Sequence, residues 1–138
     1  MLKGLLPMLA AHALALPTWA LAATGLAAFL GHVLPIYYGF KGGKGVATAL
    51  GVLLGLHYGV GLAAILTWLG MAFVFRYSSL AALTAAALAP ALVFAFTGSL
   101  TLTVGMIAMT VIVFWRHTGN IRRLLAGTES KIGAKKTA

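Results

Sequence analysis

The chain of 138 residues contains no cysteine and no aspartate, and Glu129 is its single acidic residue. The lack of cysteine excludes disulfide frameworks, thiolate zinc sites and thiol nucleophiles. The lack of acids excludes mechanisms that need two carboxylates, such as glycoside hydrolysis, and metal sites made mainly of carboxylates. We therefore expect neither a metal nor another cofactor.

Charge as a whole is also scarce. Charged residues make up 8% of the chain and hydrophobic residues 62%, whereas a soluble domain carries roughly 25% charged residues on its surface. Such a composition indicates a membrane protein. Ten Lys and Arg residues against one acid give a formal charge of +9. In so apolar a chain, this excess is typical of membrane orientation rather than of nucleic-acid binding.

The apolar residues fall into six runs with short breaks, at roughly 4–16, 18–38, 45–57, 59–75, 79–96 and 99–115. The runs are continuously apolar rather than alternating, which favours helices over the strands of a membrane barrel. Several approach the roughly 20 residues that cross a bilayer core. The first and third are shorter, and short tilted helices, half-helices and truncated spans all remain open. We predict an all-α membrane protein of about six transmembrane helices in a single domain, residues 1–138.

The basic residues support this count because alternating spans place all of them on one side. They are Lys3, Lys41, Lys44, Arg76, Arg116, Arg122, Arg123, Lys131, Lys135 and Lys136. The opposite turns, near Pro17, His57 and Thr97, contain no Lys or Arg. Since cytoplasmic loops carry the excess of Lys and Arg, both termini are expected in the cytoplasm. Residues 118–138 are then a basic tail that lies against anionic headgroups.

A glycine-rich segment between the second and third runs is the most informative for chemistry. Its candidate anion-binding residues are Lys41, Gly42, Gly43, Lys44, Gly45 and Thr48. Glycines let backbone N–H groups turn inward around an anion, and a helix that starts near Gly45 adds a partial positive charge. The spacing is not that of a Walker A loop. A positive-inside loop in which the glycines only turn the chain explains the segment about as well.

Other polar residues gather at the same predicted edge. His117 and Asn120 share a face if the last span continues as a helix, so they can contact a substrate, or cap the helix and contact headgroups. Ser78 and Ser79 are expected to cap the next helix or to bind a ligand. Glu129 is expected to pair with Arg123 or Arg122. His32 is expected to face the bundle interior in a structural role.

The ordered pattern of these residues resembles the bacterial integral-membrane glycerol-3-phosphate acyltransferases that use acyl phosphate as donor, the PlsY family. The matching glycine-rich segment comprises Gly31, His32, Pro35 and residues 40–48. Three further stretches match: Lys3-Gly4 with Pro7, residues 76–80, and His117, Asn120, Ile121, Arg123, Leu124, Gly127 and Glu129. These matches span nearly the whole chain.

The resemblance implies seven spans and, before the second of them, a loop of the type Ser-Gly-Asn-x-Gly-Ala-Thr-Asn. Neither the first span nor this loop has a counterpart here, so the chain is expected to be a family member shortened at its N-terminus. The implied reaction moves an acyl group from acyl phosphate to the 1-hydroxyl of glycerol 3-phosphate and forms lysophosphatidate. The implied setting is the bacterial inner membrane, with membrane lipids as further partners.

The resemblance also implies roles for the residues at the edge. His117 and Asn120 are the expected catalytic residues. The glycine-rich segment, with Ser78 and Ser79, is the expected phosphate-binding set. An impaired relative, or a non-enzymatic membrane protein such as a transporter subunit, is the alternative. Transporters place an ionisable residue near mid-membrane, whereas nearly every charge here lies at one edge, which favours the enzyme.

Overall fold

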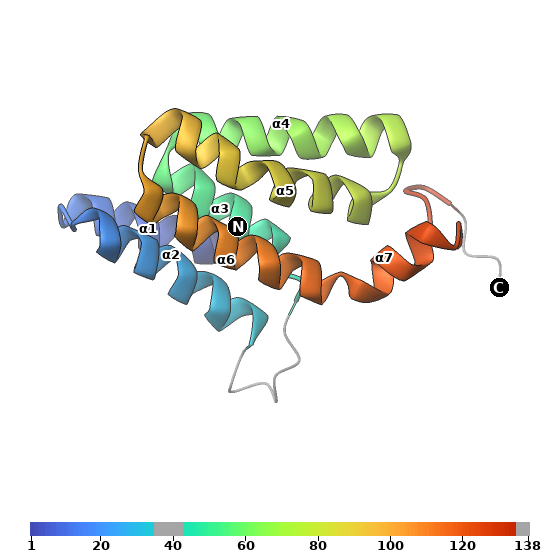
Figure 1. Ribbon diagram of the computed structural model, residues 1–138, viewed down its shortest axis with the longest axis horizontal. Helices are drawn as coiled ribbons and strands as arrows, with labels where there is room; N and C mark the ends of the chain where they lie inside the picture. The colour runs from blue at the N-terminus through green and yellow to red at the C-terminus, as the bar shows by residue number, and fades with distance from the viewer. Residues whose placement is uncertain (35–42, 135–138) are drawn as a thin grey trace.

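The computed structural model describes residues 1–34 and 43–134, so the predicted binding residues Lys41 and Gly42 lie outside the described part. Within it, all regular secondary structure is α-helical (Figure 1). The helices are α1 (Leu2–Ala13), α2 (Thr18–Val33), α3 (Val46–Leu56), α4 (Tyr58–Phe75), α5 (Ser78–Thr97), α6 (Leu100–Arg116) and α7 (Thr118–Leu125). The all-α prediction is confirmed, and each of the six apolar runs corresponds to one of the helices α1 to α6.

The helices differ in their capacity to cross a membrane. Helices α4 and α5, of 18 and 20 residues, are long enough and apolar enough to cross a membrane. The pair α6 and α7, bent by 61° at His117, counts as a third if it forms one span. The helices α2 and α3 are apolar but shorter. The count of six spans therefore stays a prediction.

The two ends of the bundle differ in charge. At one end, the His12 ring contacts the Leu56 carbonyl and the His57 ring packs on Phe96, which brings together the turns after α1, α3 and α5. At the other end, Lys44 contacts Asn120 of α7, and Arg76 after α4 contacts the segment that follows α7. The geometry confirms that the basic residues of the described chain gather at one end.

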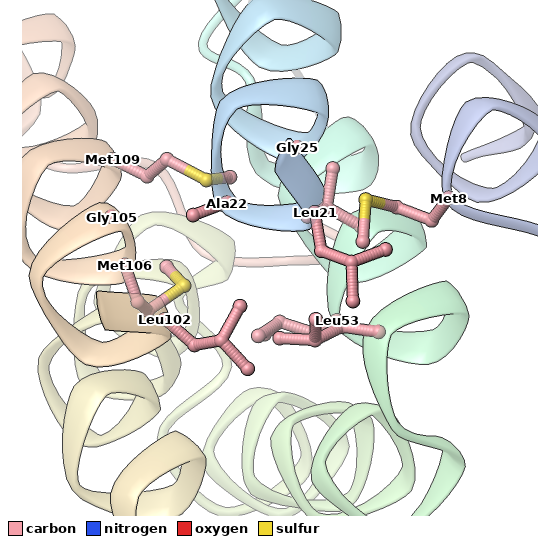
Figure 2. A pocket seen from close by; sticks show the side chains of 11 residues that line it. Met8, Leu21, Ala22, Gly25, Leu53, Leu102, Gly105, Met106 and Met109 are labelled. Carbon is pink, nitrogen blue, oxygen red and sulfur yellow. The ribbon is translucent and has the colours of Figure 1, made fainter. Parts of the chain in front are cut away.

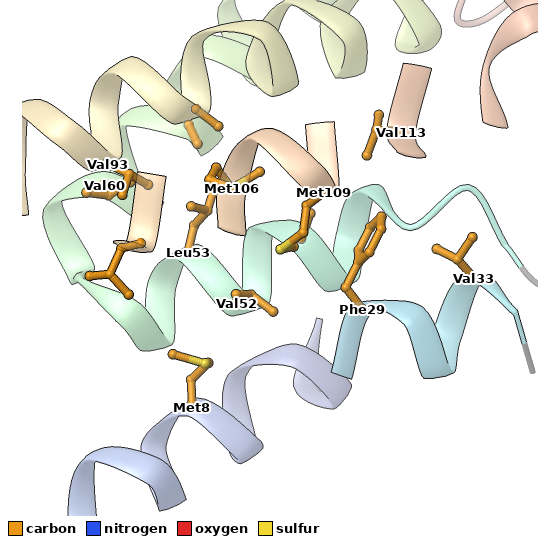
Figure 3. Packing of buried hydrophobic residues seen from close by; sticks show 14 residues of the cluster. Met8, Phe29, Val33, Val52, Leu53, Val60, Val93, Met106, Met109 and Val113 are labelled. Carbon is orange, nitrogen blue, oxygen red and sulfur yellow. The ribbon is translucent and has the colours of Figure 1, made fainter. Parts of the chain in front are cut away.

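The core takes residues from all six long helices (Figure 3). Met8 and Phe29 have no exposed surface, and they pack around α3 with Val52 and Leu53. Outside this core, large apolar side chains face outward; Phe73 on α4, for example, is 87% exposed. An apolar exterior of this kind suits lipid rather than water.

Small residues allow α1 to approach α3 closely. A Cβ at Gly4 would overlap the Thr48 carbonyl oxygen and lie 2.8 Å from the Val52 nitrogen, and a Cβ at Gly51 would overlap the Met1 carbonyl. Both obstacles are backbone atoms, which cannot rotate away. The glycine of the Lys3-Gly4 pair therefore fixes how near α1 lies to the helix that carries the glycine-rich segment.

Replacing Gly4 with alanine is expected to destabilise the protein by about 1–3 kcal/mol, because the added carbon overpacks a contact between backbones. The measurement is the thermal unfolding midpoint in detergent. The matched control is Gly70→Ala in α4, where an added Cβ meets no atom within 4 Å. The control is expected to gain stability, since alanine is the better helix former. A lower midpoint for Gly70→Ala than for Gly4→Ala would contradict the packing argument.

Helix α5 contains Pro90, whose missing N–H leaves the carbonyl of Ala86 without its usual helical partner. The hydroxyl of Thr110 on α6 donates to this carbonyl at 2.9 Å. A neighbouring helix thus satisfies the freed group, as a protein in an apolar medium requires. This hydrogen bond fixes α5 against α6 below the site described next.

A small void of about 20 Å³ lies between α1, α2, α3 and α6 (Figure 2). Apolar side chains and two glycines surround it, and Met8, Met106 and Met109 form much of its wall. Flexible methionine side chains commonly fill such irregular gaps. Because the lining side chains carry no charge or hydrogen-bonding group, this void is a packing feature and not a site for an ionic ligand.

Candidate functional site

A cavity of about 540 Å³ lies at the basic end of the bundle. Its polar lining residues are Lys44, Ser78, Ser79, His117, Asn120, Glu129 and Ser130. Its apolar lining residues are Met1, Val46, Ala47, Leu50, Trp68 and Ala82. Five residues that the sequence analysis proposed for binding or catalysis, Lys44, Ser78, Ser79, His117 and Asn120, thus surround one space, although they come from three separate parts of the chain.

Gly45 positions Lys44 at the mouth of this cavity. It is the N-cap of α3 and has a φ of +83°, a conformation that favours glycine. A Cβ there would overlap the ring of Phe29 and lie 2.8 Å from Val33 on α2. The predicted helix start near Gly45 is confirmed. Lys44 is therefore held just before the N-terminal end of a helix, where the helix dipole also favours an anion.

His117 lies at the break between α6 and α7 and is 2% exposed. Its Nδ1 lies 2.8 Å from the Val113 carbonyl oxygen. Because a carbonyl oxygen only accepts hydrogen bonds, Nδ1 carries a proton. In the neutral ring Nε2 is then a proton acceptor. The helix bends by 61° at His117, so His117 and Asn120 do not lie on one face of a continuous helix as predicted. Both residues nevertheless line the cavity.

Glu129, in the segment after α7, joins α5 and α7 through its carboxylate. Its Oε1 accepts from the Ser79 hydroxyl and from Asn120 Nδ2, each at 2.6 Å. Its Oε2 accepts from Arg123 Nε, also at 2.6 Å. The expected pairing of Glu129 with a neighbouring arginine is confirmed for Arg123. On the far side of the amide, Lys44 Nζ donates to Asn120 Oδ1 at 2.6 Å.

These contacts change the acidity of Glu129. Burial of the carboxyl raises its pKa, but the hydrogen bonds from Ser79, Asn120 and Arg123, with the charge of Arg123, outweigh that effect and hold the pKa at about 2. The ordinary value is 4.5. The ionised form is thus strongly favoured in the folded protein.

The low pKa predicts an acid-sensitive stability. A carboxyl whose pKa falls on folding contributes stability above its unfolded pKa, and that contribution is lost as the pH falls through the folded value. The contribution of Glu129 is expected to be complete above pH 4.5 and to disappear between pH 4.5 and about 2. The measurement is the unfolding midpoint against pH in detergent. Glu129→Gln is expected to unfold more easily at neutral pH and to lose the acid-dependent component; an unchanged pH profile in this variant would contradict the assignment.

The remaining predicted residues lie elsewhere. Thr48 is 1% exposed on the side of α3 that α1 covers, and it does not line the cavity. His32 is half-buried at the end of α2, with its ring against Gly43. The expectation that Ser78 or Ser79 caps α5 is wrong, because Tyr77 is the N-cap and makes no side-chain capping bond. Ser79 instead donates to Glu129, a stronger bond because its acceptor is charged.

Trp68 and part of residues 118–138 are among the contributors to the cavity that the sequence analysis missed. Trp68 lines it from α4, whereas tryptophan near a span end ordinarily indicates an interfacial anchor. Part of residues 118–138, expected as a tail on the headgroups, also contributes Glu129 and Ser130 to the wall, and hydrogen bonds to the turn after α4 hold this segment in place. Ile132 N and the Arg76 carbonyl are hydrogen-bonded at 2.6 Å, and the Arg76 guanidinium returns a bond to the Ile132 carbonyl. No local pattern distinguishes such residues, because their role depends on segments far away in sequence.

An apolar helical bundle, with its described cations at one end and polar side chains around a cavity there, defines a multi-pass integral membrane protein. The family follows from comparison with known proteins. The profile of the glycerol-3-phosphate acyltransferase family matches residues 1–127, and the chain belongs to this family. The resemblance found in the sequence motifs is confirmed.

Named relatives and solved structures agree with this membership. The glycerol-3-phosphate acyltransferase of Thioalkalivibrio sulfidiphilus is 56% identical over 98% of this chain and 66% of its own length. That of Methylococcus capsulatus is 54% identical over 97% of this chain and 68% of its own length. Crystal structures of PlsY, an integral membrane glycerol 3-phosphate acyltransferase, superpose with a TM-score of 0.89 at 42% identity, in a glycerol 3-phosphate form and a lysophosphatidic acid form. They cover 96% of this chain, which spans about two thirds of the length of these proteins.

Proposed function

We propose that the chain carries the acyl-transfer site of a glycerol-3-phosphate acyltransferase, which moves an acyl group from acyl phosphate to the 1-hydroxyl of glycerol 3-phosphate. Family membership supports the reaction class. The single observation that supports the site is the cavity that unites Lys44, His117 and Asn120. Both substrates and the released phosphate are anions, which suits a cavity with Lys44 at its mouth and whose only acid, Glu129, is already paired with Arg123.

Acyl transfer from acyl phosphate needs little assistance from a protein nucleophile or a metal ion. The 1-hydroxyl oxygen attacks the acyl carbon, the bond from that carbon to the phosphate oxygen breaks, and phosphate leaves. Acyl phosphate is an activated donor, so alignment of the two anions supplies much of the acceleration. Lys44, with the amides of Gly43 and Gly45, holds a phosphate, and Lys41 and Gly42 complete this set. Nε2 of His117 accepts the hydroxyl proton or orients the hydroxyl, and Asn120 orients the acceptor or the donor.

The location follows from the same proposal. Acyl phosphate and lysophosphatidate are amphiphiles whose chains partition into lipid. The basic end of the bundle is the cytoplasmic end by the positive-inside rule, so the cavity opens where water-soluble glycerol 3-phosphate meets the bacterial inner membrane. Membrane lipids contact the apolar exterior. Residues 1–138 form one domain.

The test is acyl transfer in proteoliposomes. The purified chain, alone and preceded by the first helix and loop that the family resemblance implies, is incubated with labelled glycerol 3-phosphate and acyl phosphate. Extractable labelled lysophosphatidate is measured over time. We expect product with acyl phosphate and none with donor omitted, and an acyl thioester donor tests donor choice. Absence of product from both forms of the protein, folded and inserted, contradicts the proposal.

A further inference from the structure

The amide of Asn120 stands between two groups of opposite hydrogen-bonding character. Its Nδ2 donates to Glu129, and its Oδ1 accepts from Lys44, each at 2.6 Å. A carboxylate only accepts and an ammonium only donates, so the amide has one orientation that satisfies both. Asn120 is 6% exposed, and an amide turned the wrong way is expensive at such a buried position.

From this arrangement we infer that Glu129 is a positioning residue: through the Asn120 amide, its carboxylate sets where the Lys44 ammonium stands in the cavity. The inference rests on the proposed function for its consequence, since Lys44 is the cation proposed to hold phosphate. The connection joins the segment just before α3 to α7 across 76 residues of sequence, and it continues across nine residues to Glu129.

The surroundings of Glu129 make its acceptor-only character necessary. Ser79 and Asn120 both donate to Oε1, and Arg123 donates to Oε2. A glutamine of the same shape has only one oxygen. The hydrogen bond from Arg123 is charge-assisted, so the glutamine oxygen remains its acceptor. The new NH₂ group then faces Asn120. Asn120 then presents its oxygen to this group and its own NH₂ to Lys44. An NH₂ group cannot accept from an ammonium, so the hydrogen bond that holds Lys44 is lost.

This role differs from simple anchoring of the chain after α7. An anchor stabilises the fold and leaves Lys44 unchanged once the protein is folded. Replacing a positioning residue changes the position and reactivity of the Lys44 ammonium in a protein that is still folded. The two are separated by a measurement on Lys44 itself that does not need turnover.

The experiment follows the acetylation rate of Lys44 by an amine-reactive ester, with mass spectrometry and with Lys3 as the internal reference. Loss of a hydrogen bond that involves a charged group is expected to raise the Lys44 rate about tenfold in Glu129→Gln and in Asn120→Ala. The variant that carries both substitutions is expected to have the same Lys44 acetylation rate as Asn120→Ala alone, because both changes break the same chain of hydrogen bonds. Arg122→Ala is the matched control, since Arg122 is exposed beside Arg123; its Lys44 rate should equal that of the unmodified protein.

An unchanged Lys44 rate in folded Glu129→Gln overturns the inference, and so does a double variant whose effects add. If Glu129→Gln does not fold, Asn120→Asp and Asn120→Ala replace it. Asn120→Asp keeps an acceptor toward Lys44 and should protect it, whereas Asn120→Ala should expose it; equal rates overturn the inference. The Michaelis constant for glycerol 3-phosphate should rise with the Lys44 rate. Absence of transfer by the unmodified protein contradicts the proposed function alone, because the acetylation result still stands.

Discussion

Replacing Lys44 with alanine is expected to raise the Michaelis constant for glycerol 3-phosphate about 10- to 100-fold, the range for losing a hydrogen bond between charged groups. Lys44 lines the cavity and lies just before the first turn of α3, so its ammonium and the helix dipole act on the same ligand. Turnover at saturating substrate is expected to fall less than the Michaelis constant rises.

The controls for this prediction separate local binding from net charge. Arg122→Ala removes one positive charge at the same end of the bundle without touching the cavity lining, and it is expected to leave the Michaelis constant near its original value. Lys44→Arg keeps the charge but changes its shape and reach, so only partial recovery is expected. An unchanged constant in Lys44→Ala, or an equal rise in Arg122→Ala, is incompatible with a phosphate contact at Lys44.

Replacing His117 with alanine is expected to lower turnover about 100-fold or more, the lower end of the effect of a general acid or base. The reason is geometric. The hydrogen bond from Nδ1 to the Val113 carbonyl fixes the ring and leaves Nε2 as the acceptor. The side chain is buried and lines the cavity. The measurement is initial rate at saturating concentrations of both substrates.

A structural contribution of His117 must be separated from a chemical one. His12→Ala is the matched control because His12 contacts a backbone carbonyl at the opposite end of the bundle, and its turnover should be unchanged. The unfolding midpoint of His117→Ala reports any loss of fold. Imidazole added to the folded variant is expected to restore part of the turnover through the space that the ring vacates. Normal turnover in folded His117→Ala would contradict a catalytic role for His117.

The physical reasons for success and failure of prediction are visible in single residues. The N-terminus of α3 could be predicted because Gly45 is a local requirement, a positive φ beside a close helix. The pairing of Glu129 with Arg123 could be predicted because the two lie six residues apart. The hydrogen bond from Ser79 to Glu129 crosses 50 residues, and nothing near Ser79 in sequence distinguishes it from an ordinary capping serine. Thr48 belongs to the glycine-rich segment, yet it is buried within α3 and does not line the cavity.

The sequence by itself determined the helical class, the approximate positions of the apolar helices, the concentration of basic residues at one end and the family. Each of these depends on composition, on hydrophobic runs or on ordered motifs, which are local properties of the chain. The tertiary structure decided which polar residues share a cavity, that Trp68 forms part of its wall, and that Asn120 joins Glu129 to Lys44. Those facts depend on how helices far apart in sequence pack together, because hydrogen bonds of 2.6 Å form only between side chains that the fold has already brought face to face.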